Sequence, residues 1–301
     1  MNIPKLPVEL LDLTLGFLCN DKATLVSCSL ACRRFRSRCQ ILLFESYRLS
    51  PIDSSPNSRS LDDLSSPQRL ARALDTSPHL ARSIKRLVFG RPSSHFTPRT
   101  GREKSVYDSC RRILPQLYSE LVNLERLEYN ASHSGSSWLS LPKQVGLGKE
   151  QTWVGEVLPV THLSLRDITE IPLSWFHTFP KLQEITLQEV SFTNIPIDGG
   201  RKGGKERKSD GAPILVKRLN LAIGGELLMQ FCKWISASAS VSAKSLEEFA
   251  IAGHFVDRQT SLRSINGLYK GSATLMKLGL STLKRVELTV VGAVESNGYL
   301  V

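Results

Sequence analysis

A six-residue segment whose last three residues place apolar side chains at alternate positions recurs along the chain and constrains its fold more than any other feature. In an extended backbone, alternate side chains point to opposite faces, so each copy predicts a strand with one apolar and one polar face. The copies are IKRLVF (84–89), LERLEY (124–129), VTHLSL (160–165), LQEITL (182–187), VKRLNL (216–221), LEEFAI (246–251) and LKRVEL (283–288).

Stretches with helical periodicity lie between some of these strands. The predicted helical stripes are Leu227, Phe231 and Trp234, and, in a second helix that Pro115 should end or kink, Val106, Cys110, Ile113 and Leu117. Strands that alternate with helices favour a parallel sheet with helical crossovers. The chain is therefore predicted to be an α/β protein over most of its length.

The spacing of the strands suggests an irregular repeat. The inward residues used to measure it are Leu87, Leu127, Leu163, Ile185, Leu219, Phe249 and Val286, and their intervals run from 22 to 40 residues. Leucine-rich repeats have periods of about 20–29 residues, so only the step from Leu163 to Ile185 fits without an insertion. We predict that residues 68–301 form an irregular leucine-rich-repeat-like solenoid with parallel strands.

In such a solenoid, the residues that flank the inward pairs line one exposed face of the sheet, where repeat proteins hold their partners. Taken singly, each charge is more simply a solvated surface residue, and only the shared position across the repeats makes the set a hypothesis. The charged candidates are Arg86, Arg126, Glu128, Arg166, Glu184, Arg218 and Glu248, and His162, Gln188 and Asn220 share their positions. The hypothesis requires parallel strands and side chains that are not buried.

The N-terminal segment LPVELLDLTLGFLCNDKATLVSCSLACRRF (6–35) predicts short helices that are apolar on more than one side. Pro7 signals a helix start, and Asn20 or Asp21 caps a second helix. In the first helix, one stripe is Leu11, Leu15 and Leu18, and the other is Leu10, Leu13 and Phe17. In the second helix, one stripe is Leu25, Cys28 and Cys32, and the other is Val26 and Leu30. A third helix has the single stripe Phe35, Cys39 and Leu42. Helices this short cannot bury two faces among themselves. Either the rest of the chain or a partner must cover the second face.

This segment resembles an F-box, the helical module of ubiquitin-ligase substrate adaptors. The resemblance rests on Leu6-Pro7, Glu9-Leu10, Leu18, Leu25 and CRRF (32–35), with Phe35 where a tryptophan is common in the family. The segment TSPHLARSIKRLVF (76–89) is also similar to segments of F-box proteins that are abundant in mushroom-forming fungi. The resemblance implies a three-helix module over residues 1–49 that binds a Skp-family linker protein and, through it, a cullin. It implies that Leu6, Pro7, Leu10, Leu18, Leu25 and Leu30 either contact the linker or form the module core. A box-like module that binds another scaffold stays open.

The resemblance also implies a role for the rest of the chain. F-box modules are often followed by leucine-rich repeats, so residues 68–301 would bind a protein substrate for ubiquitination. Residues 50–67, with seven serines and three prolines, predict a linker, and a helix is predicted from Gln68 to about Leu80.

The basic composition leaves two other classes open. The net charge is +11, and residues 81–112 contain nine basic and two acidic residues. This excess could attract nucleic acid, and a basic nucleic-acid-associated protein stays open as an alternative. No recognised binding module overlaps the segment, so a solvated loop and helix face is favoured over a nucleic acid partner. GGRKGGK (199–205) matches half of a phosphate-binding loop, but Glu206 stands where Ser or Thr should hold magnesium, so 201–208 is predicted to be a basic loop. A non-catalytic repeat scaffold also stays open.

Neither the cysteines nor the histidines predict a metal, a cofactor or a catalytic centre. The six cysteines lack zinc spacing, and Cys28 and Cys32 suit buried thiols one helical turn apart. We therefore expect no enzyme activity, no cofactor and no metal.

Glu9 and Asp12 interrupt what would be the apolar core of a signal peptide, and no run is long enough for a membrane helix. The protein is expected to be intracellular, in the cytoplasm, the nucleus or both.

Overall fold

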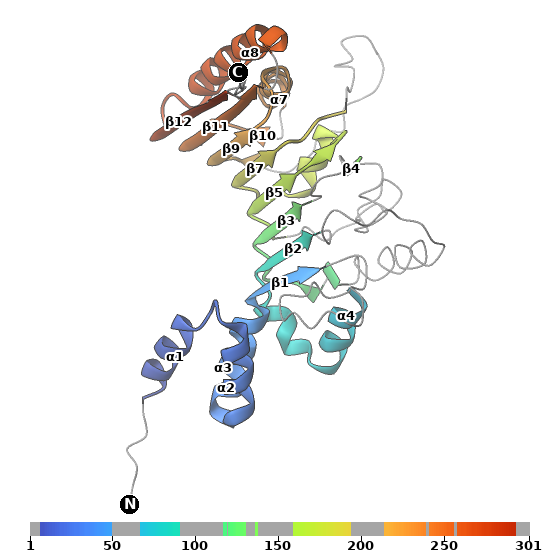
Figure 1. The fold of residues 1–301 in the computed structure, drawn as a ribbon, viewed down its shortest axis with the longest axis vertical. Coiled ribbons are helices and arrows are strands. Elements are labelled where there is room, and N and C mark those ends of the chain that lie inside the picture. The colour runs from blue at the N-terminus through green and yellow to red at the C-terminus, as the bar shows by residue number, and fades with distance from the viewer. Residues whose placement is uncertain are drawn as a thin grey trace, which may run out of the picture. The chain divides into compact units, whose positions relative to one another are not determined.

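The fold is mixed α/β with a mostly parallel main sheet, as a computed structural model shows for residues 7–49, 67–90, 117–118, 120–130, 136–137, 159–193, 214–238, 241–255 and 258–292 (Figure 1). The eight strands of the main sheet follow one another in chain order, and every pair with a described register is parallel. They are β1 (Ser46–Leu49), β2 (Arg86–Gly90), β3 (Arg126–Asn130), β5 (His162–Arg166), β7 (Glu184–Gln188), β9 (Arg218–Ala222), β11 (Glu248–Phe255) and β12 (Arg285–Gly292). All seven strands predicted from the recurring pattern are confirmed.

The chain divides into two compact units. The first unit contains residues 1–129 and 141–156, and the second contains residues 130–140 and 157–301. Strands β1, β2 and β3 belong to the first unit, and the five later strands belong to the second.

Three short helices open the first unit, as the apolar stripes predict: α1 (Val8–Phe17), α2 (Lys22–Ala31) and α3 (Arg33–Glu45). Asp21 caps α2, because its carboxylate accepts hydrogen bonds from the Thr24 backbone N–H (3.0 Å) and hydroxyl (2.6 Å). The helices close around a small core, formed by the buried Leu15, Leu25 and Cys39 with Leu18, Cys28, Phe35, Leu42 and Leu43 packed against them. One predicted stripe of each helix thus forms the core.

Helix α3 runs directly into strand β1, which pairs with β2. The Lys85 backbone N–H donates to the Glu45 carbonyl at 3.0 Å, and the Lys85 ammonium pairs with the Glu45 carboxylate at 3.1 Å. The predicted linker, of which residues 50–66 lie outside the described residues, therefore follows the first strand of the sheet and does not separate the three helices from it. The division into 1–49, 50–67 and 68–301 stays a prediction.

The helix predicted from Gln68 to Leu80 is two elements, α4 (Pro67–Thr76) and η1 (Pro78–Ser83). Pro78 has no N–H to donate and disfavours a helical conformation at Ser77 before it, so α4 ends and a 3₁₀ turn begins with Pro78. This break was readable from the sequence and was not predicted.

In the second unit, the strands stack with their inward residues in register. Leu163, Ile185, Leu219, Phe249 and Val286 form one row across the sheet, and Leu165, Leu187, Leu221, Ile251 and Leu288 form the next. The first four members of each row are buried. A repeated backbone contact precedes β7, β9, β11 and β12: for example, the N–H groups of Lys217 and Arg218 both donate to the Gln183 carbonyl.

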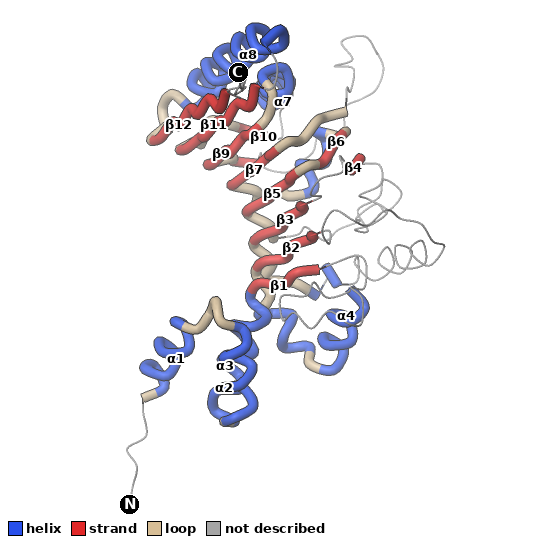
Figure 2. Tube along the Cα trace, viewed as in Figure 1, coloured by secondary structure: helices blue, strands red, loops and turns tan. Residues whose placement is uncertain are grey.

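Helical segments pack over the apolar rows of the second unit: η2 (Leu173–Thr178), α7 (Gly225–Ala237) and α8 (Arg258–Gly279) (Figure 2). Helix α7 was predicted, but its buried stripe is Leu228, Phe231 and Ile235, because α8 covers it from a second side. Helix α8 was not predicted. A Cβ at Gly267 would lie 2.6 Å from the Gly225 backbone, so the close approach of α7 and α8 requires glycine there.

The described part of the second unit also contains two short pairs of parallel strands. These are β4 (Ser136–Ser137) with β6 (Ile168–Thr169), and β8 (Ile214–Leu215) with β10 (Val241–Ser242).

Replacing an inward residue of the second unit should destabilise it far more than replacing an outward one. Leu219→Ala should lower the free energy of unfolding by about 2–5 kcal/mol, because it leaves a cavity in a fully buried row. Leu215→Ala should change it by about 0.5 kcal/mol or less, because that side chain is 49% exposed. Urea denaturation followed by circular dichroism measures both, and equal effects would contradict the register.

The cap on α2 should make the first unit sensitive to acid. The hydrogen bonds from Thr24 hold the pKa of Asp21 below its ordinary value of 3.8. A carboxylate with a lowered folded-state pKa stabilises the protein above its unfolded-state pKa, and this stabilisation is lost as the pH falls through the folded-state value. Asp21→Asn, which keeps a capping oxygen but does not titrate, should show a shallower fall in thermal midpoint below about pH 4 than the parent. Superimposable pH profiles would rule out this role for the cap.

Candidate functional site

Large apolar side chains on α1 and α2 lie exposed, on the faces opposite the small helical core. Phe17 is 80% exposed and Leu30 is 83% exposed. We call the set of Leu10, Leu13, Phe17, Val26 and Leu30 the helical face. Its α1 members recur at helical spacing, as do its α2 members, so each helix presents a continuous stripe to solvent. An exposed apolar patch of this kind is typical of an interaction site.

The residues that the sequence predicted for partner binding fall into two groups in the structure, one exposed and one in the core of the helices. Leu10, Leu30 and Pro7 are exposed and can contact a partner. Leu25 is fully buried, and Leu18 packs against the same core, so both belong to the module interior. Leu6 lies outside the described residues. Leu13, Phe17 and Val26 were missing from the predicted set, although the stripes of the sequence already placed them beside Leu10 and Leu30.

On the sheet of the first unit, two of the predicted charges bind each other. Arg86 on β2 donates to Glu128 on β3 through two parallel hydrogen bonds, Nε to Oε1 at 2.7 Å and Nη2 to Oε2 at 2.8 Å. Arg86 is half-buried, and the hydrogen bonds from its guanidinium to Glu128 raise its pKa above the ordinary value. Arg126, also on β3, has an exposed side chain.

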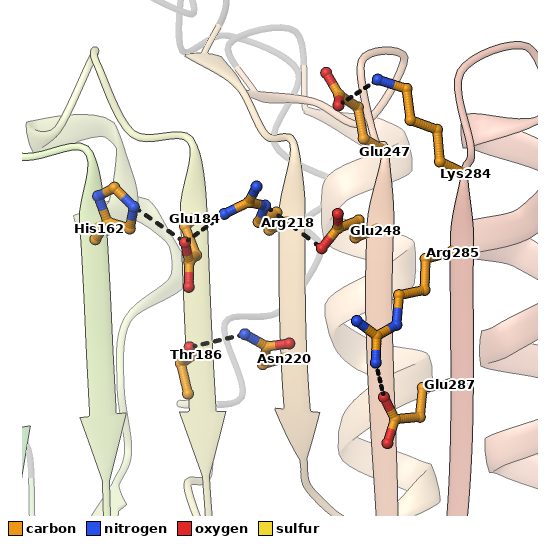
Figure 3. Close-up of polar contacts among 10 residues, drawn as sticks. All are labelled: His162, Glu184, Thr186, Arg218, Asn220, Glu247, Glu248, Lys284, Arg285 and Glu287. Atoms are coloured by element: carbon orange, nitrogen blue, oxygen red, sulfur yellow. Dashed lines mark hydrogen bonds and ion pairs between the residues drawn. The ribbon is translucent and has the colours of Figure 1, made fainter.

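On the sheet of the second unit, the predicted charges form a row that we call the polar ladder: His162, Glu184, Arg218 and Glu248 (Figure 3). Glu184 Oε2 lies 3.0 Å from His162 Nε2 and 3.8 Å from Arg218 Nη1. Arg218 Nε lies 3.5 Å from Glu248 Oε2. Neighbouring strands thus place groups that can carry opposite charge side by side, which stabilises a sheet.

A second row of outward side chains runs beside the polar ladder. It contains the short polar side chains of Ser164, Thr186 and Asn220, followed by Ala250 and Glu287. Asn220 donates to the Thr186 hydroxyl at 3.4 Å (Figure 3). Arg166, two residues beyond Ser164 on β5, pairs with Asp167 at 3.5 Å. All these side chains are half-buried or exposed, as the sequence hypothesis requires.

Sequence reasoning missed two charged residues on the last strand. Arg285 lies in register with Glu248, and Glu287 pairs with Arg285 at 3.1 Å (Figure 3). Arg285 precedes the inward Val286 just as Arg218 precedes Leu219, so the same count along the chain would have found it. Val286 and Leu288 are 40% and 49% exposed, because β12 is the last strand in the sheet order.

His162 connects the polar ladder to the side chain of the residue that precedes it in the chain. The Thr161 hydroxyl lies 2.7 Å from His162 Nδ1, and Glu184 lies on the other side of the ring. Glu184 is shared with Arg218, so this chain of contacts links neighbouring strands.

Among the described residues, no group of three or more His, Cys, Asp or Glu side chains could hold a metal ion. Burial raises the pKa of the Cys39 thiol and raises that of Cys232 to about 12, which disfavours the reactive thiolate at both.

The basic segments that the sequence singled out are largely outside the described residues. Of 81–112, the structure describes 81–90, and 199–208 lies outside altogether. In the part of the chain that is described, no helix combines the length and the apolar character needed to cross a bilayer.

Comparison with known proteins assigns no family: no family model, curated protein or solved structure matches the chain.

The Arg86–Glu128 pair should couple more strongly than the exposed Arg285–Glu287 pair. Both hydrogen bonds of the first pair are short and parallel, whereas the second pair joins side chains that are 69% and 54% exposed. A double-mutant cycle with Arg86→Met and Glu128→Gln should give a coupling free energy of up to about 1 kcal/mol. The same cycle at Arg285 and Glu287 should give a value close to zero. Equal couplings would contradict the geometry.

Proposed function

We propose that this protein is a substrate-recognition adaptor of a Skp–cullin–F-box ubiquitin ligase. Helices α1 to α3 form the F-box and bind a Skp-family linker protein, which connects the chain to a cullin. The strands that follow form an irregular leucine-rich-repeat-like solenoid, and its polar face binds a protein substrate. The adaptor has no chemistry of its own and acts by raising the effective concentration of the substrate near the ubiquitin-charged enzyme.

The observation that supports this proposal most strongly is that α1 and α2 each have two apolar faces. One face is used by the module core around Leu15 and Leu25. The helical face is not needed for that core, yet it presents Phe17 and Leu30 at 80% and 83% exposure. Side chains of this size favour leaving water, so a partner that covers them would gain affinity. The sequence of the same segment resembles an F-box, which names the class of partner.

The polar face of the sheet supports the second half of the proposal. The strands follow one another in chain order with their apolar rows in register, as in a solenoid. The polar ladder places Arg218 between the carboxylates of Glu184 and Glu248, so a substrate must supply groups that complement both signs. Such alternation favours selectivity over raw affinity.

Removing residues 1–49 does not test this proposal. That truncation deletes β1, whose Leu49 is fully buried in the first unit. The remainder would be destabilised whether or not the helices bind a linker. Leu25→Asp is equally uninformative, because it places a charge in the module core.

The informative variant changes only the helical face. The intact chain should bind a purified Skp-family linker, and Leu10→Asp with Leu30→Asp should weaken binding by about 100-fold or more, since two exposed anchors become charged. Leu280→Asp is the matched control, because Leu280 is 81% exposed in the second unit. It should bind as the parent does. Isothermal titration calorimetry measures all three, and circular dichroism verifies that each is folded.

Two results would contradict the proposal. Failure of the folded, intact chain to bind the linker would remove the adaptor function. Equal binding by the double variant and the Leu280→Asp control would show that the helical face is not the contact.

A further inference from the structure

Three arginines at the start of α3 are exposed and have no ion pair among the described residues. These are Arg33, Arg34 and Arg36. The fourth arginine of the helix, Arg38, reaches back to Asp12 on α1 at 3.6 Å. The single acidic residue of α3, Glu45, lies at its other end and pairs with Lys85.

These charges do not stabilise the helix that contains them. The N-terminal end of a helix carries a partial positive charge, and its first turn favours acidic residues. The first turn of α3 contains no acidic residue. Arg33 and Arg36 are also three positions apart, where like charges repel. Local sequence and structure conflict here, and conflicts of this kind are expected at functional surfaces.

The arginines adjoin the helical face. Helix α2 ends at Ala31 and α3 begins at Arg33, with Cys32 alone between them. Three residues of extended chain span at most about 11 Å, so the Cα atoms of Leu30 and Arg33 lie within that distance. The exposed Leu30 side chain and the guanidinium groups of Arg33, Arg34 and Arg36 therefore extend from neighbouring parts of the chain. An apolar centre with a charged rim is the usual anatomy of a protein–protein interface.

We propose that the partner that covers the helical face is acidic where it meets the start of α3, and that its carboxylates pair with Arg33, Arg34 and Arg36. This inference rests on the proposed function and names the chemistry of the linker surface that docks there. Guanidinium groups bind carboxylates through two parallel hydrogen bonds, which suits arginine better than lysine for this role. Charges at a rim act chiefly on the rate of association, which they raise at low salt. The apolar side chains then hold the complex together.

The test is the salt dependence of the association rate with a purified Skp-family linker. The test variant is the triple replacement Arg33→Gln, Arg34→Gln and Arg36→Gln in the full chain. The matched control is Arg48→Gln, Arg72→Gln and Arg82→Gln, which removes the same charge from exposed positions elsewhere in the first unit. Glutamine is a good helix former, so both triples should fold, and circular dichroism verifies this.

We expect the association rate of the parent to fall by about tenfold or more between low and high salt. The test variant should associate about tenfold more slowly than the parent at low salt, and its rate should be nearly independent of salt. Its dissociation rate should change less. The control triple should keep both the rate and the salt dependence of the parent within about twofold, since its charges lie outside the contact.

The outcomes separate this inference from the proposed function. If the linker binds but the two triples behave alike, the acidic contact is overturned and the adaptor function stands. If the intact chain does not bind the linker, both fall. A short DNA duplex serves as a second probe. Binding of DNA that the test variant loses, together with an unchanged linker association rate, would assign the arginines to nucleic acid and overturn the inference.

Discussion

The register of the apolar rows in the second unit determines where most other features of that unit lie. Leu163, Ile185, Leu219 and Phe249 lie side by side across four parallel strands and are buried. Because side chains alternate along a strand, a slip of one residue would move the buried set to the solvent side. The same register brings His162, Glu184, Arg218 and Glu248 into one row. The ion pairs of the polar ladder are thus a consequence of apolar packing, and exposed pairs of this type contribute little stability on their own.

The strands could be predicted from the sequence because burial of one sheet face leaves a period of two. The helices were harder. Helix α8 escaped prediction because its contact with α7 is made partly by Gly267 and Gly271, which allow close approach but add nothing to an apolar stripe. Helix α7 was predicted with its stripe displaced by about one position, since Leu228 and Ile235 are buried by a neighbour that the sequence pattern did not reveal. The charged candidates were found by counting from the inward residues. Arg285 was missed because the list of charged candidates ended at Glu248, although Val286 was already counted as an inward residue.

The roles of the N-terminal leucines could not be assigned from sequence. Leu25 and Leu30 are the same residue type in the same helix, yet one is fully buried and the other is 83% exposed. Both stripes of each helix are apolar, so periodicity alone gives two equally good cores. The choice is made by α3, whose Phe35, Cys39 and Leu42 pack on only one side. This tertiary contact divides the three helices into an interior and the exposed helical face.

The direct connection from α3 to β1 has a mechanical consequence. A flexible tether would let a partner on the helical face sample many positions relative to the sheet of the first unit, whereas a continuous helix does not. The 13 residues of α3 span about 20 Å, and each residue turns the helix by about 100°. The length of α3 therefore fixes the distance between the helical face and β1, and its number of residues fixes the direction in which the helical face points. Inserting one residue into α3 would change this distance very little and would point the helical face in a different direction.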